Sequence, residues 1–220
     1  MQTIVWLPEE TPQADRERIA EVATSHVYPA TGRVDVSLGQ GDLLVAGNDP
    51  QRALQVAPHI DGLRYLQTFS AGVDKLIGHL PAGVVLCDAA GVHDIAVAEW
   101  VLMAILAANR RLPEHIAAQL RGTWRDDRLT GDDLDGANVL LVGAGSIGRA
   151  VEARLTAFGP QIVRVARRAR EGVHAIADLP RLLPDADIVV ILVPHTPETR
   201  HLFDAVAIGA MRPGAVLVNA

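Results

Sequence analysis

The amino-acid sequence predicts an α/β protein with parallel β-sheets, and three observations support this prediction. Short runs of β-branched residues alternate with longer segments of helical periodicity along the chain, which is typical of βαβ units. A glycine-rich turn follows one of the predicted strands, near residue 143. The composition, with 49% hydrophobic and 4% aromatic residues among 220, is that of an ordinary globular protein.

Four strands are expected in the first half of the chain. They are residues 3–7 (TIVWL), 42–46 (DLLVA), 63–68 (LRYLQT) and 84–87 (VVLC). Thr11 is of a residue type that caps helices, and Pro12 suits the first helical position, so a helix is predicted to begin there.

The second half is predicted to begin with a helix over residues 95–111. Asp94 is its expected N-cap. Arg110 and Arg111 place positive charge at its other end, where the helix dipole is negative. The helix is apolar nearly all round, so it must be covered on more than one side.

Two explanations account equally well for the burial expected of the apolar helix 95–111. The helix is either a buried linker or part of a homodimer interface that includes Trp100 and Trp124. A membrane span is excluded, because the apolar run 95–108 contains Glu99 and is shorter than the ~20 residues a membrane helix needs.

A phosphate-binding turn is predicted after NVLLV (138–142), which has the pattern of a buried strand. The turn has the motif G-x-G-x-x-G, formed by Gly143, Gly145 and Gly148. In such a turn the first glycine makes the tight bend, the second lets a pyrophosphate approach the backbone, and the third lets helix pack on strand. The N–H groups around Ser146 and Ile147 would then point at the anion.

The helix after the turn has apolar residues at helical spacing and stops at Gly159 and Pro160. These apolar residues are Ile147, Val151, Leu155 and Phe158. The next strand is QIVRVA (161–166), which completes a βαβ unit.

The end of strand 161–166 is where an Asp or Glu would bind the adenosine ribose of NAD, and Ala166, Arg167 and Arg168 stand there instead. A carboxylate repels a 2′-phosphate, whereas a guanidinium binds it through hydrogen bonds of roughly 1.5 to 3 kcal/mol each. NADPH is therefore predicted over NADH, with Arg167 as the main contact and Arg168 or Arg170 in support. The alternative is a solvated run of surface arginines.

Five blocks along the chain resemble, in order, those of the D-isomer-specific 2-hydroxyacid dehydrogenases. They are FSAGVDKL (69–76), GVHDIAVAEWVLMAILAANRRL (91–112), VLLVGAGSIGRAVEARLTAFG (139–159), LLPDADIVVILVPHTPETRHLF (182–203) and MRPGAVLVNA (211–220). The resemblance implies two Rossmann-like domains with parallel sheets. Residues 1–94 would be the N-terminal part of a flavodoxin-like substrate domain, and 95–220 a dinucleotide-binding domain. Both are expected to be incomplete at the C-terminus, the second lacking its last strands.

The resemblance also implies roles for individual residues. The backbone amides of Ala71 and Gly72 would hold the carboxylate of a 2-keto acid, since paired N–H groups form an anion nest. Val97 would lie near the nicotinamide. The residues expected beside the adenosine are Val193, Pro194 and Thr199. His195 would flank the cofactor and is interpreted as a solvated loop residue, and His93 is interpreted as a local contact; neither is expected to be a catalytic base.

The segment LVNA (217–220) resembles the strand that leads, in this family, to an arginine, a glutamate and a histidine of the active site. The chain stops at Ala220, so no catalytic residue is expected within it. The parent protein is expected to transfer hydride between NADP(H) and a small 2-keto or D-2-hydroxy acid, like a glyoxylate or hydroxypyruvate reductase. These 220 residues are expected to be a truncated, binding-competent but inactive fragment; a non-enzymatic, dinucleotide-sensing interaction protein is the alternative.

Charge and cysteine content exclude other classes. The net charge of −6, with both signs spread along the chain, argues against nucleic acid as a partner and against a polybasic membrane-binding surface. Cys87 is the single cysteine, and the start MQTIVWLPEE has no basic region leading into an apolar one. The cytoplasm is therefore the expected compartment, and no metal site is predicted.

Overall fold

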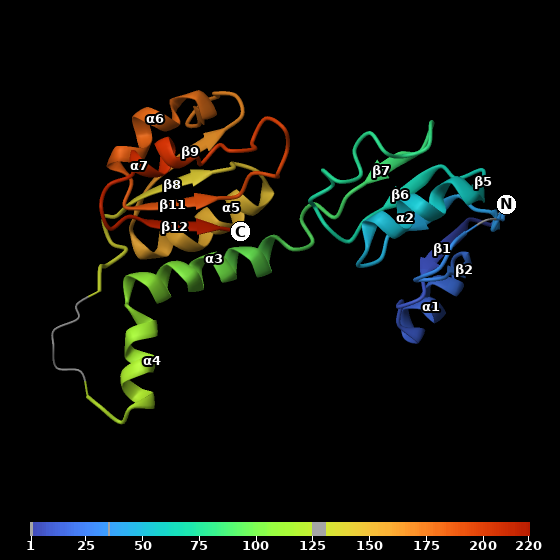
Figure 1. The fold of residues 1–220 in the computed structure, drawn as a ribbon, viewed down its shortest axis with the longest axis horizontal. Helices are drawn as coiled ribbons and strands as arrows, with labels where there is room; N and C mark the ends of the chain where they lie inside the picture. Colours follow the sequence, from blue (N-terminus) through green and yellow to red (C-terminus); the bar gives the residue numbers. More distant parts are fainter. Residues whose placement is uncertain (1, 35, 125–130) are drawn as a thin grey trace. The chain divides into compact units, whose positions relative to one another are not determined.

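The computed structural model describes residues 2–34, 36–124 and 131–220. The chain forms two compact units, Met1–Val92 and His93–Ala220, and each is described by itself (Figure 1). Each unit has a five-stranded sheet in which every described pair of neighbouring strands is parallel. The predicted α/β class with parallel sheets is confirmed.

The sheet of the first unit has the strand order β2-β1-β4-β6-β7. Its strands are β1 (Ile4–Pro8), β2 (Thr24–Tyr28), β4 (Leu43–Val45), β6 (Tyr65–Gln67) and β7 (Val85–Cys87). A separate parallel pair joins β3 (Gly39–Gln40) to β5 (Ile60–Asp61). The helices are α1 (Gln13–Ala20) and α2 (Pro50–Val56), with a 3-10 turn at Ala57–His59. Without the short pair, the order along the chain is 2-1-3-4-5, as in flavodoxin-like folds.

Strand β2 was not among the predicted strands, although it pairs with β1 over five residues. Its sequence TSHVY has no β-branched run because it is an edge strand, and only Tyr28 in it is buried. The Tyr28 hydroxyl donates to the Val45 carbonyl at 2.9 Å and accepts from the Gly47 N–H at 3.2 Å. Burial raises the pKa of Tyr28 to about 12.

The predicted cap of the first helix was wrong. Helix α1 begins at Gln13, and Thr11 lies before it in a turn, where its N–H donates to the Pro8 carbonyl at 3.0 Å. The Thr11 hydroxyl is buried and meets no hydrogen-bond partner among the described residues. The turn at the end of β1 therefore decides where α1 starts, rather than the residue type at position 11.

A buried arginine organises the first unit around α2. Arg52 is only 6% exposed, and its guanidinium donates to three backbone carbonyls of one loop. These are the carbonyls of Pro29 at 2.8 Å, Gly32 at 2.7 Å and Thr31 at 3.2 Å. Hydrogen bonds to a charged donor are the stronger kind, so this side chain fixes the loop after β2 against α2.

The sheet of the second unit has the order β10-β9-β8-β11-β12, which along the chain is 3-2-1-4-5. Its strands are β8 (Asn138–Val142), β9 (Gln161–Ala166), β10 (His174–Ala175), β11 (Ile188–Ile191) and β12 (Val216–Asn219). This is the order in which the first five strands of a doubly wound Rossmann sheet lie. The order reverses between β8 and β11, so their carboxyl ends flank the position where such sheets bind ligands.

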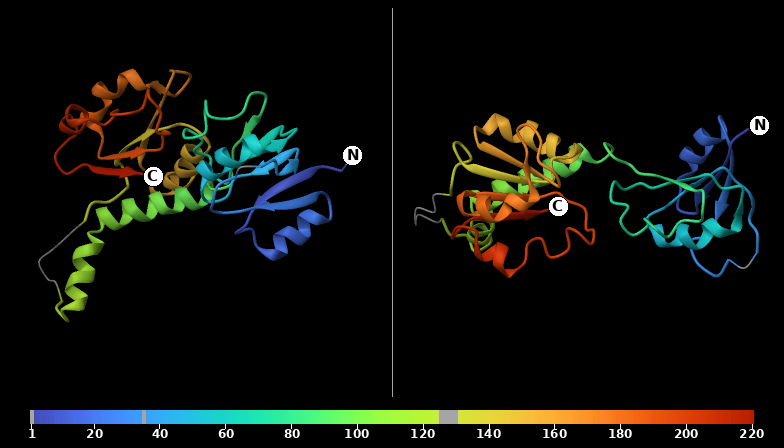
Figure 2. Two further views of the ribbon diagram at one scale, coloured as in Figure 1. Left: turned by 45° about the vertical axis from the view of Figure 1, so that its right-hand side comes forward. Right: turned by 90° about the horizontal axis from the view of Figure 1, so that it is seen from above.

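Helices cover both faces of this sheet (Figures 1 and 2). They are α3 (Asp94–Asn109) and α5 (Ser146–Leu155) on one face, and α6 (Leu179–Leu182) and α7 (Ala205–Gly209) on the other, with 3-10 turns at Thr156–Phe158, Ile176–Asp178 and Leu183–Asp185. Helix α4 (Leu112–Leu120) follows α3 and extends away from the sheet (Figure 1). Helices α3 and α5 share a buried cluster with Val139 and Leu141, while α6 packs on Leu140 and Val142 from the other face. This alternation along β8 is the two-residue period of a strand buried on both sides.

Helix α3 differs at both ends from the prediction of 95–111. His93 is the N-cap and Asp94 the first helical residue, where a carboxylate still complements the helix dipole. The helix ends at Asn109 because Arg111 takes a left-handed φ of 51°, after which α4 begins. The rest of the second unit leaves part of α3 uncovered, because Trp100 is 47% and Met103 55% exposed. Among the residues described, no helix is long and apolar enough to cross a membrane.

An ion pair joins α5 to β9. The Arg164 Nε donates to Glu152 Oε2 at 2.6 Å, and its Nη2 donates to Glu152 Oε1. The hydrogen bonds from Arg164 hold the pKa of Glu152 below its ordinary value of 4.5. The charged form of Glu152 is therefore favoured in the folded state.

Substituting Arg52 by Met should lower the free energy of unfolding of the first unit by about 2 to 4 kcal/mol, because three carbonyls lose a charged donor. Urea unfolding followed by the fluorescence of the buried Trp6 measures this loss. The exposed Arg18→Met variant is the control. Equal stability of the two variants would show that the loop after β2 does not need Arg52.

Substituting Glu152 by Gln should lower stability at pH 7 by about 1 kcal/mol, because a partly exposed bidentate ion pair is lost. The lowered pKa means that this contribution is present above the unfolded pKa and disappears as the pH falls through the folded one. Urea unfolding of both proteins at pH 7 and pH 3 measures the difference, which should shrink at the lower pH. A difference that grows in acid would contradict the pairing.

Candidate dinucleotide-binding site

The glycine-rich turn lies between β8 and α5, as predicted. Gly143 has a φ of +124°, which L side chains rarely adopt, and a Cβ there would lie 2.8 Å from the Leu192 carbonyl. A Cβ at Gly148 would lie 2.2 Å from the Gly143 oxygen. Both glycines are therefore required sterically, the first beside the end of β11 and the last where α5 packs against the strand end.

Gly145 has the opposite environment. Nothing in the described part of the chain comes within 4 Å of a Cβ built at this position, and its backbone conformation is extended. It is also the N-cap of α5, and no described side chain caps the helix in its place. The space beside Gly145 is thus open. This is the position at which the second glycine of the motif is predicted to let a ligand approach the backbone.

The start of α5 supplies the groups that a pyrophosphate needs. The first N–H groups of a helix have no partners within the helix, and Ser146 and Ile147 are the first two residues of α5. Their amides add to the positive end of the dipole of a ten-residue helix. The residues of this turn therefore fit a dinucleotide phosphate.

The predicted arginines follow β9 at the same edge of the sheet. Arg167 and Arg168 are exposed directly after the last strand residue. The pKa of Glu198, in the loop after β11, lies below its ordinary value, first because of a hydrogen bond with Thr196 and also because of the charge of Arg167. Of the causes of this lowered pKa, the charge of Arg167 is the smallest.

The 193–199 loop is held by its own threonine. The Thr199 hydroxyl donates to the Pro194 carbonyl at 2.5 Å and accepts from the Thr196 N–H at 2.8 Å. Val193 is half-buried and packs on the cluster beneath α6 and α7. In this arrangement Thr199 shapes the loop, and His195 is exposed on it.

Arg170 has a partner that the sequence did not indicate. Its Nη2 donates to the carbonyl of Ala144, inside the glycine-rich turn, at 3.0 Å. The hydrogen bond joins residues 26 positions apart, and no local pattern predicts it.

The remaining predicted residues lie elsewhere. Ala71 and Gly72 belong to the first unit, after β6, where the Gly72 N–H donates to Ser70 Oγ at 3.0 Å. Val97 lies in the first turns of α3 and packs on the core of the second unit. Their roles stay predictions.

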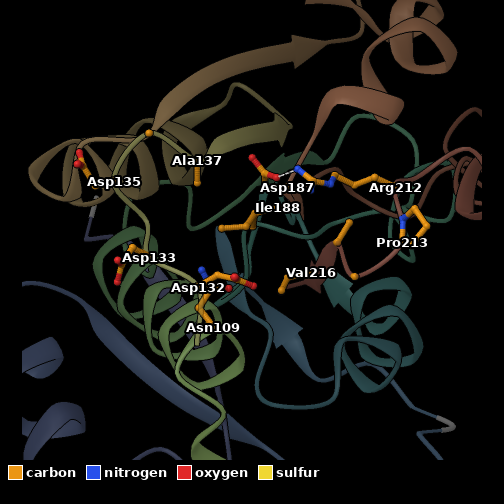
Figure 3. A pocket seen from close by; sticks show the side chains of 13 residues that line it. Asn109, Asp132, Asp133, Asp135, Ala137, Asp187, Ile188, Arg212, Pro213 and Val216 are labelled. Atoms are coloured by element: carbon orange, nitrogen blue, oxygen red, sulfur yellow. Dashed lines mark hydrogen bonds and ion pairs between the residues drawn. The ribbon is translucent and has the colours of Figure 1, made fainter. Parts of the chain in front are cut away.

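A pocket of about 390 Å³ lies at the opposite edge of the second unit's sheet (Figure 3). Its lining includes the residues before β8, β11 and β12, together with Asp132 and an Asp187–Arg212 ion pair. Parallel sheets bind ligands at the carboxyl ends of their strands, so this pocket is not the predicted site. In the described ranges, no group of three or more His, Cys, Asp and Glu side chains could hold a metal ion.

The chain is similar to known proteins in sequence and in fold. Residues 102–220 match the model of the D-isomer specific 2-hydroxyacid dehydrogenase, NAD binding domain. The chain is 30% identical to a D-3-phosphoglycerate dehydrogenase of Methanocaldococcus jannaschii over 212 residues, which are 88% of this chain and 40% of that protein. It is 34% identical to a glyoxylate reductase of Thermofilum pendens over 171 residues, 71% of this chain and 50% of that one.

A solved structure of an NADPH-dependent glyoxylate/hydroxypyruvate reductase from Sinorhizobium meliloti, in complex with NADP and sulfate, matches with a TM-score of 0.79 at 25% identity. The match covers 99% of this chain and 72% of that one. The chain spans less than half the length of the first curated relatives it matches. With its motif, its strand order and more than half its length matched, the chain belongs to the D-isomer specific 2-hydroxyacid dehydrogenase family.

Proposed function

We propose that the second unit binds NADP(H) at the carboxyl edge of its sheet, and that the protein is an oxidoreductase for a small 2-keto or D-2-hydroxy acid. The observation that carries this proposal is the start of α5. It has no side-chain cap among the described residues, it is held close to β8 by Gly148, and it is open at Gly145. When bound, the nicotinamide supplies or accepts the hydride, while the residues of the chain bind and orient the rest of the cofactor.

The preference for NADP(H) is supported by the end of β9. No carboxylate stands at Ala166, Arg167 or Arg168 to accept hydrogen bonds from a ribose diol. A 2′-phosphate carries more negative charge than one carboxylate, and the Arg167 guanidinium is exposed at the end of β9 to bind it. Arg167 is therefore the proposed main ligand, with Arg168 beside it.

The proposed carboxylate site of the substrate is the turn with Ala71 and Gly72. The Gly72 N–H donates to Ser70 Oγ. A rotation of the Ser70 side chain would free this N–H to donate to the carboxylate of a 2-keto acid. Hydride transfer requires both substrate and cofactor, whereas nucleotide binding depends on the second unit alone. Nucleotide affinity is therefore the property that tests the cofactor proposal.

A homodimer formed through α3 is the proposed assembly, and the cytoplasm the proposed compartment. Trp100 on α3 is 47% exposed and Trp124, after α4, is 93% exposed, so a second copy would bury apolar surface that this chain leaves in water. Such a surface would also suit the partner of a dinucleotide-sensing protein. Oxidation of NADPH on addition of glyoxylate to the intact protein distinguishes the enzyme from the sensor.

Substituting Arg167 by Met should weaken NADPH binding about 10- to 100-fold and leave NADH binding unchanged, because only NADPH loses a charged hydrogen bond. Titration by nucleotide fluorescence measures both affinities. The control is Arg181→Met, which removes an exposed arginine on α6. Equal affinity of the unchanged chain for NADH and NADPH would refute the preference.

Substituting Gly145 by Val should abolish binding of both nucleotides without loss of stability, since the new side chain enters open space where the pyrophosphate would lie. Thermal unfolding should give an unchanged Tm. Gly148→Ala is the matched comparison and should lower the Tm, because its Cβ meets the Gly143 oxygen. A Gly145→Val variant that binds NADPH normally would place the nucleotide elsewhere.

A further inference from the structure

Arg170 begins a tight turn between β9 and β10. Its N–H donates to the Val173 carbonyl at 3.0 Å, and the Val173 N–H donates back to the Arg170 carbonyl at 2.8 Å. Gly172 permits this turn with a φ of +68°. Two reciprocal backbone hydrogen bonds therefore fix the position from which the Arg170 side chain extends.

The turn is also tied to α5. Arg164 Nη1 lies 3.5 Å from the Gly172 carbonyl oxygen, and the same guanidinium pairs with Glu152 of α5. The chain after β9 and the helix after the glycine-rich turn are thus joined through one arginine. These hydrogen bonds hold the 170–173 turn in place, so that Arg170 can contact the neighbouring glycine-rich turn.

From this base the Arg170 guanidinium reaches the Ala144 carbonyl at 3.0 Å. Ala144 lies between Gly143 and Gly145, two residues with wide backbone freedom. In a trans peptide the C=O and the following N–H point in opposite directions. A donor that holds the Ala144 oxygen therefore also decides where the Gly145 N–H points.

The peptide between Ala144 and Gly145 could otherwise turn over. Gly145 has no side chain to restrict the rotation of this peptide, because glycine has the widest backbone freedom of all residues. In the flipped orientation a carbonyl oxygen, rather than an N–H, would face an approaching phosphate and repel it. A charged donor on the Ala144 oxygen opposes that flip.

We propose that Arg170 is a positioning residue of the phosphate-binding turn, and that it acts through the Ala144 carbonyl rather than as a ligand of the 2′-phosphate. The proposal rests on the proposed function, because it concerns dinucleotide affinity. It assigns different tasks to neighbouring arginines. Arg170 orients the Gly145 N–H, which would bind the pyrophosphate of NADH and of NADPH alike. Arg167 selects between the two nucleotides.

The test measures the affinities of the 220-residue chain and its variants for NADH and NADPH by fluorescence titration. Arg170→Met should weaken both about tenfold and leave their ratio unchanged. Arg170→Lys, which keeps a charged donor, should recover part of both affinities. Arg167→Met should change the ratio, and Arg181→Met should change neither value.

A loss confined to NADPH in Arg170→Met would overturn the proposal and make Arg170 a phosphate ligand. Unchanged affinity for both nucleotides would also overturn the proposal, because the glycine-rich turn would then keep its conformation without Arg170. Failure of the unchanged chain to bind either nucleotide would instead refute the proposed function. Circular dichroism melting verifies folding, and if Arg170→Met does not fold, Arg170→Gln and Arg170→Lys provide the same comparison of ratios.

Discussion

The close contact between Gly148 and the Gly143 carbonyl is the constraint on which the rest of the second unit's carboxyl edge depends. Any side chain at position 148 would enter the space of that oxygen, so only glycine lets α5 start this near to β8. The contact brings the positive end of the helix to the point where the strand order reverses. As a result, the first N–H groups of α5, which have no partners within the helix, lie beside an open approach at Gly145.

The loops around this helix start are held by bonds of their own. Thr199 closes the loop after β11, and Arg170 joins the turn after β9 to the glycine-rich turn. Arg167 and Arg168 extend into solvent from the end of β9. Because the backbone is held before a ligand arrives, less conformational freedom would be lost on binding. Some side chains of these short segments thus hold the backbone, while others are exposed to solvent.

The elements that the sequence predicted well are those whose signal is local and strong. Strands β8 and β9 have the predicted bounds, because their apolar runs differ clearly from the turns around them. Strand β2 escaped prediction because an edge strand needs few apolar residues. The end of α3 was placed slightly too far along the chain because Arg110 and Arg111 suit the negative end of a helix dipole. The helix ends at Asn109 instead, since Arg111 takes a left-handed backbone conformation.

The sequence by itself determined the fold class, the family and the glycine-rich turn between β8 and α5, since each is encoded in residue types at fixed spacing. The tertiary structure alone decided what the polar side chains do. Arginines at 164, 167 and 170 are equivalent as residue types, yet one pairs with Glu152, one is exposed after β9 and one bonds to Ala144. A long, flexible guanidinium takes whichever acceptor the folded backbone brings within its reach, and that acceptor can be distant in sequence.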